Sequence, residues 1–242
     1  MIEIELPAIV DFELPSGGEG AVARAAEVLA KAEFPVILNG AGVVLGDAVK
    51  ESMALAERLD APVCCGYQHN DAFPGSHPLF AGPLGYNGSK AGMQLIKDAD
   101  VVLCLGTRLN PFSTLPGYGI DYWPADAKII QVDINPDRIG LTKKVTVGIV
   151  GDAAKVAKGI TAQLSDTAGD EGRAERKAKI AQSLGLRACV LWLGARHVDP
   201  DHAGGQGRMK IRIVQKRLRR KPVREHGDDH LSPSDGLGGC WC

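Results

Sequence analysis

The chain has 242 residues and a formal net charge of −1, with 45% hydrophobic and 24% charged residues. This composition is ordinary for a folded globular protein, and it excludes a fibrous chain, a wholly disordered chain and a disulfide miniprotein. The apolar runs are far shorter than a membrane span, and the N-terminus lacks the basic and then apolar pattern of a signal peptide. We therefore expect a cytoplasmic protein with no membrane partner.

The small net charge is the sum of two unlike parts. Residues 1–182 carry 17 Lys and Arg against 23 Asp and Glu, a net charge of −6. Residues 183–242 carry 11 Lys and Arg against 6 Asp and Glu, a net charge of +5. A charge asymmetry of this size indicates two segments of different character.

The first part of the chain alternates between helical and strand patterns. The spacing of apolar residues predicts helices over residues 20–34, 47–59, 89–99, 152–164 and 173–181. Short apolar runs predict strands over residues 35–38, 61–65, 100–105, 128–133 and 145–150. Ser89 is expected to cap the helix that follows it. Strands that are apolar throughout and alternate with helices predict an α/β fold with a doubly wound, mostly parallel, Rossmann-like sheet.

The same patterns divide the chain into four parts. We expect a linker or extension over residues 1–18, a central α/β domain over 19–166 and a charged linker helix over 167–182. No helical or strand period is sustained after that, so residues 183–242 are interpreted as an irregular tail, disordered or non-native. The basic run over residues 208–224 is typical of a solvated tail, and nucleic-acid binding is the alternative. We expect no nucleic-acid partner.

Ligands of a doubly wound sheet bind beyond the carboxyl ends of its strands. Glycines there let the backbone approach a phosphate, and an arginine can hold an anion through two parallel hydrogen bonds. The ligand-facing candidates are Gly40, Gly42, Gly106, Thr107, Arg108, Asn110 and Asp133. The glycine spacing after the first strand misses the dinucleotide pattern by one position, so a tight turn is favoured there over a NAD site. A salt bridge is the alternative role of Arg108.

Other reactive side chains are interpreted structurally. His69, Asn70, Asp71 and His77 lack metal-binding spacing and are expected to anchor their loop by hydrogen bonds. Three cysteines lie in apolar strands and are expected to be inert core thiols: Cys64, Cys65 and Cys104. We expect no catalytic residue and no metal ligand in this chain. The long aromatic loop over residues 111–124 is of a length typical of functional loops.

Several stretches together carry a family resemblance: residues 35–42, 55–63, 77–79, 98–108, 129–136 and 147–152. Through them, residues 4–180 resemble the central domain of thiamine-diphosphate-dependent enzymes. The stretches over residues 64–77 and 106–123 are similar to one family within that superfamily, the sulfoacetaldehyde acetyltransferases. The resemblance implies a small-molecule substrate and a homo-oligomer in the parent enzymes.

The resemblance also implies a chemistry. Such enzymes convert sulfoacetaldehyde and phosphate into acetyl phosphate and sulfite with thiamine diphosphate and Mg²⁺. The family's activating glutamate and its diphosphate-binding motif have no counterpart in this sequence. We therefore expect a truncated chain that binds no such cofactor and is inactive alone. In flavin-binding relatives, loops equivalent to residues 106–110 and 133–135 contact FAD.

Two further interpretations stay open. The abrupt rise in Arg, His, Cys and Gly after residue 182 is what a shifted reading frame produces in a G+C-rich gene. The alternative function is a stand-alone α/β module that binds a nucleotide or coenzyme A at three loops after strands, over residues 40–42, 66–71 and 106–110.

Overall fold

The computed structural model describes residues 13–86, 88–165, 170 and 172–195, with side chains up to Leu184. The chain divides into two units, Met1–His197 and Val198–Cys242. The second unit lies outside the described residues, and so do the expected basic run and most of the expected tail. Within the described chain no helix is both long and apolar enough to cross a membrane.

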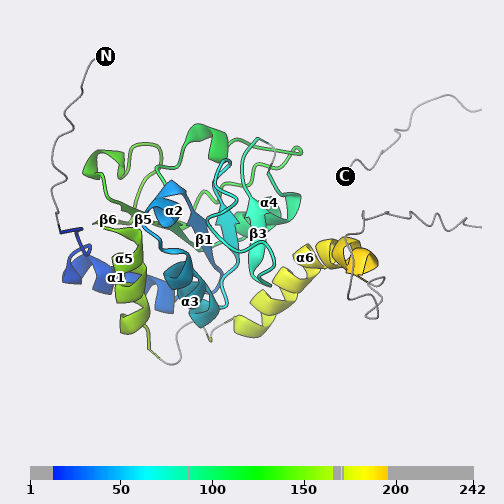
Figure 1. Cartoon of the computed structure of the whole chain (residues 1–242), viewed down its shortest axis with the longest axis horizontal. Helices are drawn as coiled ribbons and strands as arrows, with labels where there is room; N and C mark the ends of the chain where they lie inside the picture. The colour runs from blue at the N-terminus through cyan, green and yellow to red at the C-terminus, as the bar shows by residue number, and fades with distance from the viewer. Residues whose placement is uncertain (1–12, 87, 166–169, 171, 196–242) are drawn as a thin grey trace, which may run out of the picture. The chain divides into compact units, whose positions relative to one another are not determined.

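Six parallel strands form one sheet in the order β3-β2-β1-β4-β5-β6 (Figure 1). The strands are β1 (Pro35–Asn39), β2 (Val63–Cys65), β3 (Phe80–Pro83), β4 (Val101–Leu105), β5 (Lys128–Asp133) and β6 (Val147–Val150). The strand order reverses between β1 and β4, because the chain first builds the sheet outward to β3 and then continues on the other side of β1. The predicted doubly wound α/β fold is confirmed.

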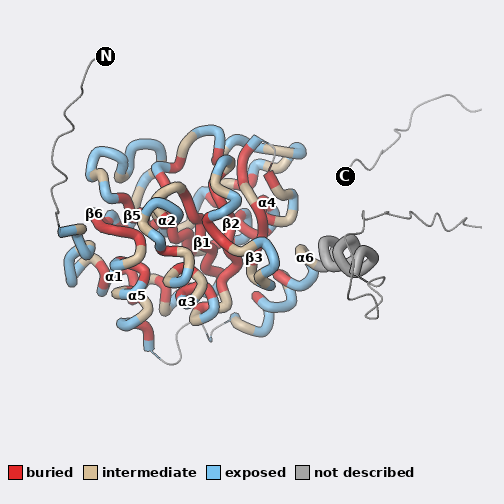
Figure 2. Tube along the Cα trace, in the orientation of Figure 1, coloured by how far each residue is buried: buried red, intermediate tan, exposed pale blue. Residues whose placement is uncertain are grey.

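Helices cover both faces of this sheet. They are α1 (Glu19–Ala30), α2 (Ala41–Leu45), α3 (Val49–Leu59), α4 (Lys90–Lys97), α5 (Ala153–Gln163) and α6 (Arg173–Ala195), with short 3-10 helices η1 (Pro111–Ser113) and η2 (Pro136–Arg138). One part of the core joins the sheet to α1, α2, α3 and α5, and a second part joins it to α4 and α6. Alternate residues of β1 and β4 enter the two parts, so the central strands are buried on both faces (Figure 2).

Several local predictions differ from the structure in instructive ways. β3 is absent from the predicted strands, because Phe80-Ala-Gly-Pro83 has the composition of a turn; its proline is tolerated at the sheet edge. The tight turn favoured by the glycine spacing is present, because Gly40 alone separates the end of β1 from the short helix over residues 41–45. α6 continues to Ala195, beyond the predicted end of the linker helix at 182. Ser89 caps α4 as predicted, since its Oγ accepts a 3.2 Å hydrogen bond from the Gly92 amide.

Ion pairs fasten α6 to the amino edge of the sheet, opposite the expected ligand site. The carboxylate of Asp60, just after α3, lies 3.1 Å from Arg173 Nε and 3.4 Å from Lys177 Nζ. Asp100 accepts hydrogen bonds from the backbone amides of Glu33 and Phe34 at the start of β1. This edge is therefore held together by charges and backbone groups.

Candidate functional site

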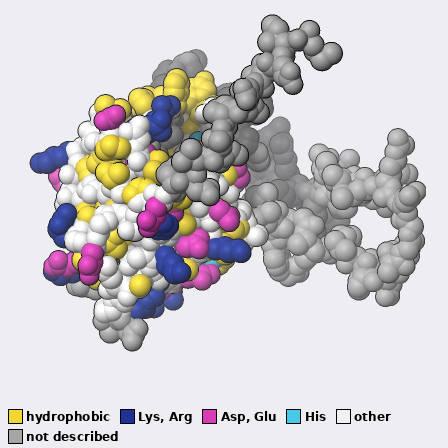
Figure 3. All heavy atoms as spheres, turned by 60° about the vertical axis from the view of Figure 1, so that its left-hand side comes forward, with side chains coloured by type: hydrophobic (Ala, Val, Ile, Leu, Met, Phe, Trp, Pro, Cys, Tyr) yellow, Lys and Arg dark blue, Asp and Glu magenta, His cyan; other side chains and the backbone are white. Residues whose placement is uncertain are grey.

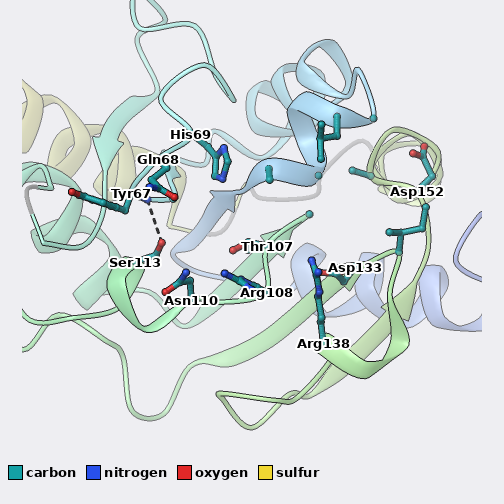
Figure 4. Close-up of a pocket in the computed structure, with 18 of the residues that line it drawn as sticks. Tyr67, Gln68, His69, Thr107, Arg108, Asn110, Ser113, Asp133, Arg138 and Asp152 are labelled. Carbon is teal, nitrogen blue, oxygen red and sulfur yellow. Dashed lines mark hydrogen bonds between the residues drawn. The ribbon is translucent and has the colours of Figure 1, made fainter. Parts of the chain in front are cut away.

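A cavity of about 780 Å³ opens at the carboxyl edge, next to the point where the strand order reverses (Figure 4). Its walls come from the segments that follow the six strands, together with Leu14 before α1. Ligand pockets typically measure roughly 300–1,000 Å³, and in open α/β sheets they lie at such a reversal. Six of the seven predicted ligand-facing residues line it: Gly42, Gly106, Thr107, Arg108, Asn110 and Asp133.

The glycines of this region are required by close backbone packing. The amide of Gly40 donates to Leu105 O (3.0 Å), and that of Gly42 donates to Gly106 O (2.8 Å). A Cβ atom on Gly40 would lie 2.5 Å from the carbonyl oxygen of Gly106, and one on Gly42 would lie 2.7 Å from the Cα of Gly106. Gly40 is buried and does not line the cavity. The three glycines thus join the β1 loop to the β4 loop.

The loop after β4 presents Arg108 to the cavity from a constrained backbone. Gly106 and Leu109 both have left-handed conformations, with φ of 60° and 54°. Leu109 is fully buried, its amide donates to Thr107 Oγ1 (3.2 Å), and its carbonyl accepts from Thr142 Oγ1 (3.1 Å). A left-handed leucine is unfavourable by about 1–3 kcal/mol and is kept only where its surroundings hold it. The exposed Arg108 therefore belongs to a loop whose backbone has little conformational freedom.

A second arginine reaches the same cavity from the turn after β5. Arg138 is the last residue of η2, and the buried Gln131 side chain donates to its carbonyl oxygen (3.0 Å) and to that of Thr107 (3.2 Å). The Gln131 Oε1 atom also accepts from the Gly140 amide (2.9 Å). Gln131 therefore links the loops that carry Arg108 and Arg138. The sequence gives little indication of this role: Gln131 is a polar residue in an otherwise apolar strand.

The cavity carries unpaired positive charge. Among the described residues, neither the Arg108 guanidinium nor the Arg138 guanidinium has a hydrogen-bond or ion-pair partner. The two carboxylates nearby are engaged by backbone amides: Asp133 Oδ1 accepts from Asn135 (2.9 Å), and Asp152 Oδ1 accepts from Lys155 at the start of α5 (3.0 Å). This arrangement suits an anionic group of a ligand.

The opposite wall is formed by the loop over residues 66–71, which lies at the expected ligand edge although its residues are not among the seven predicted candidates. Tyr67, Gln68 and His69 follow β2 and lie across the cavity from Arg108 and Arg138 (Figure 4). The Tyr67 amide donates to Ser113 Oγ (3.2 Å), which joins this wall to η1. The signal available in the sequence is the position of these residues directly after a strand. Asn110, a predicted site residue, uses its Oδ1 to cap η1 through the Phe112 amide (2.9 Å).

His77 anchors its loop away from the cavity. Its Nε2 lies 3.0 Å from Glu57 Oε1, and its Nδ1 accepts from the Leu79 amide (3.2 Å). Its ring also packs edge-on against Phe73, with centroids 5.0 Å apart. His69 lines the cavity instead, so the two histidines do not converge. The residues that the structure describes hold no group of three or more His, Cys, Asp or Glu placed to bind a metal ion.

The strand cysteines are buried thiols. Cys64, Cys65 and Cys104 are fully buried and carry their sulfur in the reduced form. Burial, with a smaller contribution from Asp71, raises the pKa of Cys65 to about 12, and burial raises the pKa of Cys104 further. A thiol that stays protonated at neutral pH is a poor nucleophile, so Cys65 and Cys104 are unsuited to covalent catalysis.

Several exposed apolar side chains line the cavity at the carboxyl edge: Leu45, Tyr86, Phe112 and Ile134. The other exposed large apolar residues of the described chain are Val44, Leu115, Tyr118, Leu141 and Val150. Figure 3 shows hydrophobic side chains concentrated at the upper end of the domain, and charged ones below. The two edges of the sheet thus differ in chemical character.

This fold and cavity define a class of ligand-binding α/β domain, and comparison with known proteins identifies the family. The family model described as thiamine pyrophosphate enzyme, central domain, matches residues 22–160. The chain therefore belongs to the thiamine pyrophosphate enzyme family, to whose central domain it corresponds. The predicted family resemblance is confirmed.

Particular relatives carry more specific names. A sulfoacetaldehyde acetyltransferase of Roseovarius nubinhibens is 76% identical over 183 residues, which are 76% of this chain and 30% of the relative. A sulfoacetaldehyde acetyltransferase of Castellaniella defragrans is 55% identical over 181 residues, 74% of this chain and 30% of the relative. A probable acetolactate synthase large subunit of Methanocaldococcus jannaschii is 38% identical over 143 residues, 59% of this chain and 24% of that protein. The chain thus spans under a third of the length of these relatives.

Solved structures support the fold. A putative thiamin diphosphate-dependent enzyme from Mycobacterium smegmatis superposes with a TM-score of 0.54 at 24% identity, covering 66% of this chain and 30% of that one. Benzoylformate decarboxylase from Polynucleobacter necessarius gives a TM-score of 0.53 at 22% identity, covering 68% of this chain and 30% of that one.

Proposed function

We propose that this chain is the central domain of an enzyme that converts sulfoacetaldehyde and phosphate into acetyl phosphate and sulfite. The observation that supports this most strongly is the 76% identity to a sulfoacetaldehyde acetyltransferase over 76% of the chain. The whole enzyme would act on a small-molecule substrate and would be a homo-oligomer that contains this domain. The contribution of this domain would be to hold the loops at the carboxyl edge of the sheet in a rigid arrangement.

Thiamine diphosphate and Mg²⁺ would supply the bond-breaking chemistry in the whole enzyme, but the described residues do not fit them. Mg²⁺ requires several oxygen ligands in octahedral geometry. The two carboxylates at the cavity, those of Asp133 and Asp152, each accept a backbone hydrogen bond, and two arginines share the cavity with them. We therefore assign the cofactor to parts of the relatives that this chain does not match.

The chain alone is expected to be inactive. The test supplies sulfoacetaldehyde, phosphate, thiamine diphosphate and Mg²⁺ and measures acetyl phosphate and sulfite, with the full-length Roseovarius nubinhibens relative as the positive control. Turnover by the control and none by this chain supports the proposal. Turnover by this chain alone contradicts it.

The composition of the last 60 residues supports a separate proposal about their origin. These residues carry eight of the 14 arginines and four of the six histidines of the chain. We propose that residues 183–242 arise from a shifted reading frame. Sequencing the coding DNA around codons 175–190 tests this, and failure of any adjacent frame to restore sequence similar to the relatives contradicts it.

A second candidate function is the binding of a nucleotide or coenzyme A in the cavity. It is favoured by the two unpaired guanidinium groups, which can hold a diphosphate, and by the exposed rings of Tyr86 and Phe112 on the cavity wall. Calorimetry with FAD, ADP and coenzyme A tests it. We expect Arg108→Gln and Arg138→Gln each to weaken any binding about tenfold or more.

The matched control is Arg24→Gln, because Arg24 is an exposed arginine on α1, away from the cavity. A saturable signal that all three variants retain would place the ligand elsewhere. No signal with any of the three ligands would remove this candidate.

A further inference from the structure

We infer that Gln131 is a positioning residue, which holds Arg108 and Arg138 as one pair for an anion that carries two phosphate groups. The inference rests on the second candidate function, because it takes the cavity to bind an anionic ligand. It goes further in naming the residue that makes the two guanidinium groups act together. Three observations carry it: the hydrogen bonds of the Gln131 amide, a second bond from Thr142, and the burial of a polar side chain in an apolar strand.

The side-chain amide of Gln131 joins the two loops through three hydrogen bonds. Its Nε2 atom donates to Thr107 O (3.2 Å), one residue before Arg108, and to the carbonyl oxygen of Arg138 itself (3.0 Å). Its Oε1 atom accepts from the Gly140 amide (2.9 Å). The amide is fixed in this orientation, since turning it over would place its oxygen against two carbonyl oxygens. One side chain thus holds the backbone beside each arginine.

A second bond holds the loop of Arg108 from its other side. Thr142 Oγ1 donates to Leu109 O (3.1 Å), so the residues immediately before and after Arg108 both have bonded carbonyl groups. Both donors, Gln131 and Thr142, belong to the segment of chain that also carries Arg138. The two arginines therefore stand on one connected piece of backbone, on the same side of the cavity (Figure 4).

The position of Gln131 within β5 indicates what its bonds are for. Gln131 is 1% exposed, and Ile129, Ile130 and Val132 beside it in the strand are buried apolar residues. A buried amide adds little net stability, because its bonds replace bonds to water, and an apolar side chain of similar size would avoid the cost of removing the amide from water. A polar residue here is therefore explained by the two arginine-bearing loops to which its bonds go.

A fixed separation of the arginines matters most for a ligand that contacts both. Among the described residues neither guanidinium has a hydrogen-bond or ion-pair partner, so both are available to a ligand. One guanidinium can hold a single phosphate through two parallel hydrogen bonds. Two linked phosphate groups can engage both, and the affinity gained then depends on how little the loops must be ordered on binding. Loss of the Gln131 bonds should thus weaken diphosphate binding more than phosphate binding.

The experiment measures the binding of inorganic phosphate and inorganic pyrophosphate to the 242-residue chain by calorimetry, at constant ionic strength. Pyrophosphate is expected to bind about tenfold or more tightly than phosphate. Gln131→Met keeps the side-chain length and removes the bonds, and it is expected to reduce this ratio about threefold or more. Thr142→Val removes the bond to Leu109 and is expected to reduce the ratio by a smaller factor. An unchanged ratio in Gln131→Met would overturn the inference.

Val132→Ala is the matched control for a loss of stability. Val132 is the next residue of β5, is fully buried and points to the other face of the sheet, so its truncation lowers the melting temperature without removing a bond to either loop. This variant should keep the ratio of the parent chain. An equal fall of the ratio in Val132→Ala and Gln131→Met would show a structural role only and would sink the inference. Should Gln131→Met not fold, the exposed site of Thr142→Val decides, and an unchanged ratio there contradicts the inference.

The same titrations separate this inference from the second candidate function. Pyrophosphate binding that Arg108→Gln and Arg138→Gln weaken, but Gln131→Met does not, would overturn the positioning role and leave the anion site in place. Absence of pyrophosphate binding to the parent chain would remove the anion site and the inference with it. The result that we expect is a ratio that falls in Gln131→Met and stays unchanged in Val132→Ala.

Discussion

Arg176 Nη2 donates a 3.0 Å hydrogen bond to the carbonyl oxygen of Leu59, which lies 117 residues earlier in the chain. The same guanidinium donates to the carbonyl oxygens of Asp60 and Glu33. Arg176 is fully buried, so a single side chain of α6 satisfies carbonyl groups at the end of α3 and before β1. This contact fixes α6 on the amino edge of the sheet.

We expect Arg176→Met to lower the free energy of unfolding by about 3 kcal/mol, because it leaves the buried carbonyl group of Leu59 and the partly buried ones of Asp60 and Glu33 without this donor. Urea unfolding followed by circular dichroism measures this. Lys179→Met, one turn further along α6 at a site that is 42% exposed, is the control and should change stability little. Equal unfolding midpoints for the two variants would show that Arg176 does not hold the helix.

Two glycines with similar left-handed conformations are expected to respond differently to alanine. Gly119 has a φ of 70°, and no heavy atom of the described chain lies within 4 Å of the position that a Cβ would take, so Gly119→Ala should cost about 1 kcal/mol. Gly106 has a φ of 60°, but its Cβ would lie 2.7 Å from the Cα of Gly42. Gly106→Ala should therefore cost about 3 kcal/mol or more, since backbone must also move. Thermal unfolding of both variants checks this, and equal losses would contradict the close approach of the two loops.

A buried polar contact lies beneath the β1 loop. Asn39 Nδ2 donates to Ser52 Oγ (2.8 Å) and to Ala72 O (2.9 Å), and Ser52 Oγ lies 3.1 Å from Asn39 Oδ1. Ser52→Ala leaves part of the buried amide unpaired and should lower stability by about 1–3 kcal/mol. The control is Ser76→Ala at an exposed site, which should be near neutral. Chemical unfolding of both variants measures the difference, and a neutral Ser52→Ala would refute this role.

The buried thiol of Cys65 predicts a loss of stability at alkaline pH. In the unfolded chain the thiol releases its proton near pH 9, whereas burial raises its pKa and keeps it protonated in the folded protein up to about pH 12. Between these values the unfolded state binds fewer protons, so stability falls as pH rises, by about 1.4 kcal/mol per pH unit. Below pH 9 the contribution is fully present.

Urea unfolding between pH 8 and pH 11 tests this with the variant Cys65→Ala. The variant should start less stable, because it leaves a small cavity, and should lose stability less steeply above pH 9 than the parent chain. Parallel pH dependences of the two proteins would contradict the assignment to Cys65. A thiol reagent should also leave the folded cysteines Cys64, Cys65 and Cys104 unmodified at pH 7.

The pattern of the sequence is sufficient for the central part of the fold. β1, β4 and β5 are five or six consecutive residues that are almost all buried, and such runs can be recognised without any tertiary information. β3 could not be recognised, because a glycine and a proline sit in a strand that depends on its pairing with β2. Edge strands of this kind need a neighbour that the local sequence does not reveal.

Part of the candidate site could likewise be predicted from the sequence, and part could not. The position of Arg108, Thr107 and Asp133 directly after predicted strands places them at one edge, because parallel strands share a direction. The loop over residues 66–71 was likewise expected at this edge. Gln131 could not be assigned, since its role comes from contacts between loops that are distant in sequence.

The sequence by itself determined the doubly wound sheet and the edge at which a ligand site lies, because burial on both faces and strand direction are properties of local pattern. The family followed from the resemblance of several stretches to known proteins, and not from that pattern. Only the tertiary structure decided that Gly40 packs against Gly106 instead of facing a ligand, that Arg108 and Arg138 share one cavity, and that the exposed side chains of Leu45, Tyr86 and Phe112 line that cavity. These relationships depend on which loops become neighbours, and the order of the strands sets that. The net charge of −1 is the sum of an acidic part, residues 1–182, and a basic part, residues 183–242. The composition of the second part therefore differs from that of the domain that carries this fold.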